Sequence, residues 1–264
     1  MSVRPLFLAA ALAVAASAFA PRPVPPATRR FKVAETNHQV VDLTAVGGPQ
    51  QTSDVITTSY VTLTSRDSAR GQAVQVTIDS IHVDSLVAPG VDPSTFDSLR
   101  GSSATGWVSP TGELSNVQAD SVKGGAAKGA LRLFYPKFDA RVKVGDKWTD
   151  TTDVPGQGSG LLANATIKRI TNWVVNSGAA PDGSPARKVE SAFSESITGE
   201  VQTGQGSLGY DGTATGTATY YLNTAGMQLG AATTLNLQLS LTAPGAPEAI
   251  PVTGTLSAVV TPLR

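Results

Sequence analysis

The chain has 264 residues, 41% of them hydrophobic, so it is long enough to bury a core and disorder of the whole chain is excluded. Its 20 basic and 20 acidic side chains cancel, and charged residues make up only 15%, which argues against nucleic-acid binding. There is no cysteine, which excludes disulfides, thiolate chemistry and cysteine metal sites.

Residues 1–20 have the pattern of a secretory signal peptide. Arg4 precedes an apolar run from Leu6, and small residues with A-x-A spacing end at Ala18 and at Ala20, both of which stay candidate cleavage positions. The alternative is a transmembrane anchor, but this needs about 20 apolar residues and the run is shorter. We therefore expect a periplasmic or secreted protein with no transmembrane anchor in its mature form.

A proline-rich segment, residues 21–30, follows the signal pattern and predicts an extended tether. Residues 31–264 are then predicted to form a single β-rich domain. Within it, the alternation of apolar and polar positions that is typical of strands recurs to the end of the chain.

The alternation changes phase at two places. Apolar residues occupy even positions up to Ile78 and odd positions from Ile81. Because one extra residue reverses the face of every later side chain, a β-bulge is predicted between them. A second phase change is predicted near Arg169, inside a strand expected over 161–175.

Two helices are predicted between the strands. Asp92 as N-cap, Pro93 at the first helical position and Gly101 beyond the end predict a short helix over 92–101. Apolar residues at helical spacing predict a second helix over 120–134, although each of its glycines weakens a helix by about 1 kcal/mol relative to alanine.

The longest alternation covers 227–241 and includes Leu235 and Leu237, and a matching strand covers 250–260. At about 3.3 Å per residue the first of these strands would be about 50 Å long, which requires a curved sheet. Such a sheet has an apolar concave face that needs a cover. The predicted fold is therefore mainly β with some helix (α+β): long curved antiparallel sheets, half-barrel-like, with one or two covering helices.

The hairpins 107–114 and 221–228 align without gaps, which raises the hypothesis of a duplicated sheet. Its halves would be 31–134 and 148–264, joined by 135–147. The alternative is that common hairpin sequences recur by chance.

Catalytic and cofactor sites have little sequence support. The histidines, His38 and His82, both lie in alternating segments, where structural or exposed roles are expected. Residues 204–209 match the dinucleotide fingerprint, but that fingerprint must open a helix and more strand follows here. We therefore predict no catalytic residue, no cofactor and no metal, and a hydrolase is the least favoured class.

Apolar side chains and aromatics near turns are the remaining functional signal. They could line a cleft that takes an apolar molecule or acyl chain, or they could simply pack the core. Trp148 is expected to close one end of that core. The candidate ligand-binding residues are Trp107, Phe134, Trp148, Tyr220, Leu235 and Leu237.

The segment FDARVKVGDKW, residues 138–148, resembles the VKVGDxW signature of a group of uncharacterised bacterial secreted or lipid-anchored proteins. The G-x-G-rich stretch 204–210 is also similar. The overall plan resembles the half-barrel of periplasmic lipoprotein carriers. Lipid-anchored members carry a cysteine after the signal, which this chain lacks, and the family supplies no catalytic residue.

The long strands with one apolar face predict an exported, non-enzymatic envelope protein that binds a hydrophobic ligand or a lipidated partner in the concave face of the sheet. The alternative is a protein–protein interaction or scaffold module with a filled core, whose partner would be another envelope protein.

Overall fold

The computed structural model describes residues 27–68, 70–88, 91–119, 124–136, 138–139, 141–155, 165–203, 206–224, 226–242 and 248–263. Within these ranges eleven antiparallel strands form one sheet, so the mainly β prediction is confirmed. The strands are β1 (Ala27–Asp42), β2 (Gln50–Ser68), β3 (Gly71–Val87), β4 (Ser103–Val108), β5 (Leu114–Ala119), β6 (Lys147–Pro155), β7 (Thr166–Ala179), β8 (Pro185–Thr203), β9 (Gly206–Leu222), β10 (Gln228–Thr242) and β11 (Ile250–Pro262).

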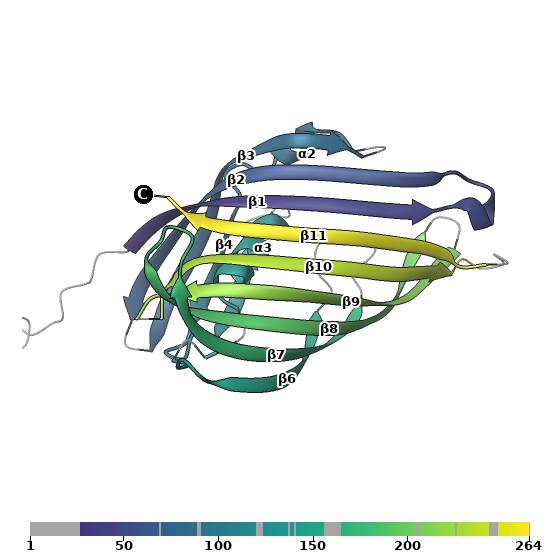
Figure 1. Ribbon diagram of the computed structural model, residues 1–264. Helices are drawn as coiled ribbons and strands as arrows, with labels where there is room; N and C mark the ends of the chain where they lie inside the picture. The colour runs from purple at the N-terminus through teal and green to yellow at the C-terminus, as the bar shows by residue number, and fades with distance from the viewer. Residues whose placement is uncertain are drawn as a thin grey trace, which may run out of the picture.

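The sheet is open and curved, with the order β5-β4-β3-β2-β1-β11-β10-β9-β8-β7-β6 (Figure 1). The chain starts in the middle at β1 and moves outward strand by strand to the edge strand β5. Residues 124–146 then connect this edge to the opposite edge at β6, and the remaining strands return to the middle, where β11 pairs with β1. The predicted half-barrel-like sheet is therefore found as an open sheet with β5 and β6 as its edges.

The helices are α2 (Ser94–Asp97), α3 (Gly125–Phe134) and a 3-10 turn, η1 (Thr44–Val46). The short helix predicted over 92–101 is thus a single α turn, and Asp92 accepts a hydrogen bond from the Ser94 backbone N–H at 2.9 Å. The described part of the helix predicted over 120–134 is α3. It contacts β3, β4, β5 and β10, and lies on the concave face of the sheet (Figure 1).

Of the clusters of buried apolar side chains among the described residues, the one beneath α3 has the most members. Phe134 is 2% exposed and its ring centroid lies 4.6 Å from that of Phe31 on β1. Each fully buried side chain of this size contributes about 1.5–3 kcal/mol. Other buried members are Val33, Val61, Leu63, Val74, Val76, Ile78, Ala104, Val108, Ala127, Leu131, Ala231 and Val260.

The bulge predicted between Ile78 and Ile81 is confirmed. Tyr60 pairs with Ser80 whereas Val61 pairs with Ile78, which leaves Asp79 as the extra residue. This insertion returns the apolar side chains on both sides of it to the concave face.

The phase change predicted near Arg169 is wrong. Strand β7 pairs with β8 in continuous register, and Ile167, Thr171 and Trp173 are buried while Ile170 is 47% exposed. Arg169 therefore shares the concave face with its odd-numbered neighbours. Alternation misassigned this strand because its inward positions include a charged and a polar residue.

The boundary predicted for the tether is also wrong. Residues 27–30 belong to β1, where they pair with 62–65 of β2. Arginine does not prevent strand formation at a sheet end, where its charge stays in contact with water. The predicted signal, 1–20, and the rest of the tether, 21–26, lie outside the described residues.

The two aligned hairpins have the same turn. Ser109 and Asn223 each donate their backbone N–H to the residue four positions later, at 2.9 Å, and Gly112 and Gly226 adopt positive φ. The two hairpins therefore close in the same way. A shared turn fits both a duplication of halves 31–134 and 148–264 and chance recurrence, so the duplication stays a prediction.

Candidate functional site

The register of the sheet shows which side chains share the concave face. Following paired residues across the strands, one row contains Val55, Asn37, Leu256, Leu235, Gly216, Phe193, Thr171 and Asp150. We call this the central row. It lies further along the strands from α3 than the buried row that contains Val33, Val260 and Ala231.

The concave face is open at the central row. Leu256 is 48% exposed, whereas Val260, four residues along the same strand and on the same face, is fully buried. Leu235 pairs with Leu256, and together with Leu237 it is only partly buried against a second apolar cluster around Leu239. Leu256 is therefore an apolar side chain on the inward face of the sheet that stays half exposed.

Glu35 lies beside this apolar surface. It pairs with Thr57 and Ala258, in the row between the central row and the buried one. The side chain is exposed, yet the protein around it displaces enough water to raise the pKa of the carboxyl group. A group that is both accessible and flanked by protein is what the wall of a hollow provides.

Four aromatic side chains form a cluster on the concave face near the β6 edge, which we call the aromatic corner. The rings of Trp148 and Trp173 stack with centroids 5.5 Å apart, and Phe138 contacts Trp173 edge-on at 5.3 Å. Tyr220 lies 5.6 Å from Phe138. Burial raises the pKa of Tyr220 to about 12, although nearby Arg169 opposes the shift.

An ion pair lies on the concave face of β7 and β8. Arg169 Nη2 is 2.5 Å from Glu195 Oε1, and its guanidinium carbon lies 4.5 Å from the centre of the Phe193 ring. Phe193 in turn covers Gly216, where a Cβ would meet the ring at 2.4 Å. Because the Glu195 side chain is only 5% exposed, the pair holds a charge that this face could not otherwise bury.

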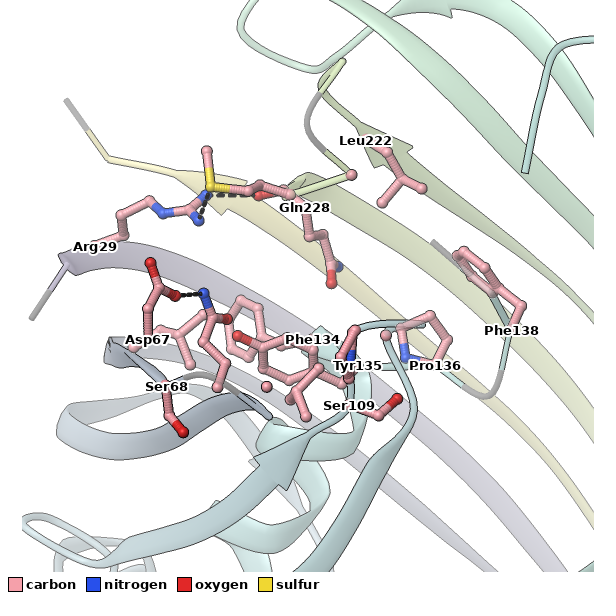
Figure 2. A pocket seen from close by; sticks show the side chains of 18 residues that line it. Arg29, Asp67, Ser68, Ser109, Phe134, Tyr135, Pro136, Phe138, Leu222 and Gln228 are labelled. Atoms are coloured by element: carbon pink, nitrogen blue, oxygen red, sulfur yellow. Dashed lines mark hydrogen bonds between the residues drawn. The ribbon is translucent and has the colours of Figure 1, made fainter. Parts of the chain in front are cut away.

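A pocket of about 460 Å³ lies where α3 ends, and we call it the end pocket (Figure 2). Phe134, Tyr135 and Phe138 give it an apolar wall. Its polar groups include those of Arg29, Asp67 and Gln228, and Arg29 and Asp67 are its charged residues. Its size is within the range of about 300–1,000 Å³ that small-molecule sites occupy.

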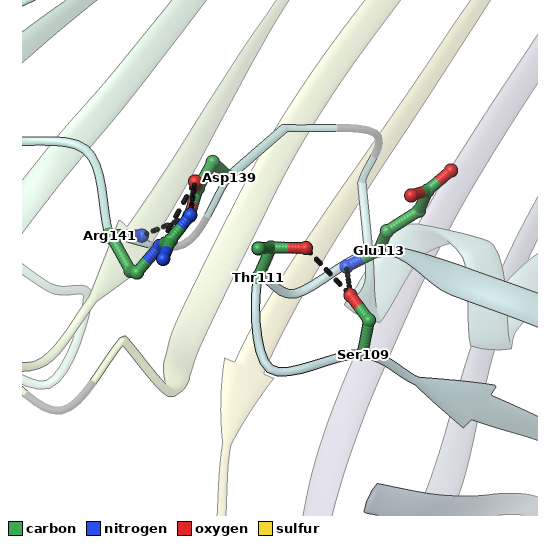
Figure 3. Close-up of polar contacts among 5 residues, drawn as sticks. All are labelled: Ser109, Thr111, Glu113, Asp139 and Arg141. Carbon is green, nitrogen blue, oxygen red and sulfur yellow. Dashed lines mark hydrogen bonds and ion pairs between the residues drawn. The ribbon is translucent and has the colours of Figure 1, made fainter. Parts of the chain in front are cut away.

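Two turns lie next to residues that line the end pocket, and Figure 3 shows the polar contacts within each turn. In the β4–β5 hairpin, the Ser109 hydroxyl accepts the Glu113 backbone N–H at 3.1 Å and lies 2.7 Å from the Thr111 hydroxyl. After Phe138, the Asp139 carboxylate accepts the Arg141 backbone N–H at 2.9 Å and pairs with the Arg141 guanidinium at 2.7 Å. Side-chain bonds therefore fix the backbone on two sides of the pocket.

The structure separates the six predicted ligand-binding residues. Leu235 and Leu237 lie on the open concave face, and Trp148 and Tyr220 belong to the aromatic corner. Phe134 is a core residue that also lines the end pocket.

Trp107 does not lie with the others. Its neighbours Ala104 and Val108 are buried on the concave face, and alternation along β4 puts Trp107 on the outer face, where its indole packs against Gly71. Trp107 therefore does not share the concave face with the other five residues, and its assignment to ligand binding stays a prediction. The position of an aromatic residue beside a hairpin turn does not by itself show which face of the sheet its side chain occupies.

Trp148 was expected to close one end of the core. It lies instead on the edge strand β6, partly buried and stacked on Trp173. Phe31 and Phe134 fill the core at the α3 end, whereas Trp148 packs against a smaller buried cluster beside the edge strand β6.

Sequence reasoning missed Glu35 and Gln228. Glu35 has inward parity with Phe31 and Val33, but a charged residue on an apolar face is usually assigned to solvent. Gln228 lies at a register shift, since it pairs with Leu222 whereas Gly230 pairs with Tyr221. The extra residue, Leu229, aims Gln228 inward, and no alternation signal marks it.

Both histidines are exposed on the outer face, with 48% and 76% of the side chains of His38 and His82 accessible. His38 Nδ1 lies 2.5 Å from Asp54 Oδ1. Within the described ranges, no group of three His, Cys, Asp or Glu side chains is placed to hold a metal ion. None of the helices described is long and apolar enough to cross a membrane.

No family model and no curated protein matches the chain.

Proposed function

We propose that this protein is an exported, non-enzymatic envelope protein that binds an apolar molecule, such as one with an acyl chain, on the concave face of its sheet. The observation that carries the proposal is the exposure of Leu256 on that face. Leucines at inward positions are normally covered, and contiguous apolar surface left open marks a binding site.

The surroundings of Leu256 support an apolar ligand. Leu235 lies directly opposite it, and Leu237 is the next inward residue on β10. We call these three leucines the floor. On the neighbouring strand β9 the inward residue Ala214 is small, whereas the Phe193 ring covers Gly216. The apolar surface therefore continues in register from Leu235 to Phe193.

Binding is tested with a neutral fluorescent probe, N-phenyl-1-naphthylamine, and its displacement by a monoacylglycerol. Leu256→Asp places a charge on the floor and is expected to raise the Kd of the probe by about tenfold or more, since a buried unpaired charge costs several kcal/mol.

The matched control is Val259→Asp. Val259 lies on the same strand, is 44% exposed, and faces outward. It should leave probe binding unchanged. Equal loss in both variants, or no probe binding by the unmodified protein, would contradict the proposal and favour the interaction module with a filled core.

A further inference from the structure

The end pocket contains a buried hydrogen-bond acceptor without a partner. Gln228 is 8% exposed, and its Oε1 has no hydrogen-bond partner among the described residues. Leaving such an acceptor unpaired costs about 1–3 kcal/mol. Figure 2 shows the Gln228 side chain reaching into the pocket toward Tyr135.

The orientation of the Gln228 amide is fixed by its other end. Nε2 donates to the backbone oxygen of Leu133, at 3.3 Å, and to that of Gly230, at 3.4 Å. Exchanging the two amide atoms would place Oε1 against two carbonyl oxygens, which repel it. The amide atom left without a partner is therefore the acceptor, and it requires a donor.

The backbone of Gln228 is also held. Arg29 Nη1 donates to the Gln228 carbonyl oxygen at 3.0 Å. The bulge at Leu229 directs the side chain inward, and Gly230 beyond it has no room for a Cβ, which would lie 2.8 Å from the Val260 carbonyl oxygen. The acceptor is consequently a built feature of the fold and not a mobile surface amide.

The charges of the pocket favour a neutral ligand. Arg29 and Asp67 line it with opposite charges, and Asp67 already accepts Gln72 Nε2 at 2.6 Å. Tyr135 is uncharged at neutral pH, as tyrosine ordinarily is, and burial raises the pKa of its hydroxyl further, to about 12. Of the remaining lining residues, Phe134, Phe138 and Leu222 are apolar, and Ser68 and Ser109 are polar but uncharged.

We propose that the end pocket binds a neutral amphiphile through a ligand N–H or O–H that donates to Gln228 Oε1, with the apolar part of the ligand against Phe134, Phe138 and Leu222. This site is separate from the floor around Leu256. A primary amide or an alcohol on a medium-length alkyl chain has the required chemistry, and the pocket of about 460 Å³ suits its size.

The test compares two ligands by isothermal titration calorimetry on the full mature chain. Decanamide carries N–H donors, and N,N-dimethyldecanamide has none. Decanamide is expected to bind about tenfold more tightly, which corresponds to one buried hydrogen bond. Equal affinity for the two ligands, or no binding of either, overturns the proposal.

The variant Gln228→Met removes the acceptor at similar volume and should bring the affinity ratio of the two ligands close to one. Gln238→Met is the control, because Gln238 is an exposed glutamine on the outer face of the same strand. It should keep the ratio of the unmodified protein. A ratio that survives in Gln228→Met contradicts the assignment, and since the ratio is measured within one protein, lost stability does not imitate the expected result.

The same titration in Leu256→Asp separates this site from the proposed floor. Decanamide preference should persist there, although that variant loses the naphthylamine probe. Loss of the preference in Leu256→Asp would show that both ligands occupy the floor and would refute a separate end pocket.

Discussion

The concave face of the sheet has two regions that differ in cover and not in backbone. Beneath α3, Val33, Val260 and Ala231 are buried, with exposed fractions of 4%, 0% and 0%. Further along the same three strands, Asn37, Leu256 and Leu235 face the same way and are exposed or only partly buried. The ten-residue helix α3 therefore covers one end of the concave face and leaves the next rows of side chains accessible.

The largest loss of stability is expected when the ring that fills the region beneath α3 is removed. Phe134→Ala is expected to destabilise the fold by about 3–5 kcal/mol, because it leaves a cavity against Phe31. Leu256→Ala should cost less than about 1 kcal/mol, because half of that side chain is already exposed. Urea denaturation of both variants measures the contrast, and similar losses would mean that the two regions are equally packed.

The aromatic corner should give an intermediate effect. Trp148→Ala removes a partly buried ring stacked on Trp173 and is expected to cost roughly 2 kcal/mol. Ile170→Ala, on the outer face of the adjacent strand, is the control and should cost less. A loss as large as that of Phe134→Ala would place Trp148 in the core after all.

The stability of the fold should also depend on alkaline pH through the Tyr220 phenol in the aromatic corner. Its folded-state pKa is raised to about 12 from an ordinary 10.0, so the associated stability is intact below pH 10 and is lost as the pH rises toward 12. Tyr220→Phe should flatten this loss by at most about 1.4 kcal/mol per pH unit.

The experiment is a series of urea denaturations between pH 9 and pH 11.5. Tyr221→Phe is the matched control, since Tyr221 is the next residue and faces outward. An identical pH slope for Tyr220→Phe and the unmodified protein would exclude burial of the Tyr220 phenol.

The smallest expected effect concerns Glu35 in the open region. Glu35→Gln should tighten binding of the neutral probe several-fold at pH 7, because the variant no longer holds a carboxylate beside the ligand. Since the pKa of Glu35 is raised, the carboxyl is neutral at low pH, and the advantage of the variant should shrink as the pH falls toward 4.5.

Asp211→Asn, on the outer face of β9, serves as the control for charge removal. It should leave probe affinity unchanged at every pH. A constant difference between Glu35→Gln and the unmodified protein from pH 7 to pH 4.5 would contradict the assignment of the effect to ionised Glu35.

Local sequence patterns determined a large part of this protein. Alternation predicted the mainly β class and the bulge beside Ile78, and the spacing of proline and glycine predicted the helix near Ser94. These features depend on residues close together in the chain, whose φ and ψ preferences and side-chain period act locally.

Tertiary structure decided the site. Whether Leu256 is covered depends on how far α3 extends over the concave face. Whether Gln228 points inward depends on how β10 pairs with β9 around Leu229. Trp107 and Arg169 show the same limit, since their faces follow from register with partners distant in sequence. Pairing and cover are long-range contacts, so the local pattern fixed that strands and helices form, and only their assembly decided which side chains were left open to a ligand.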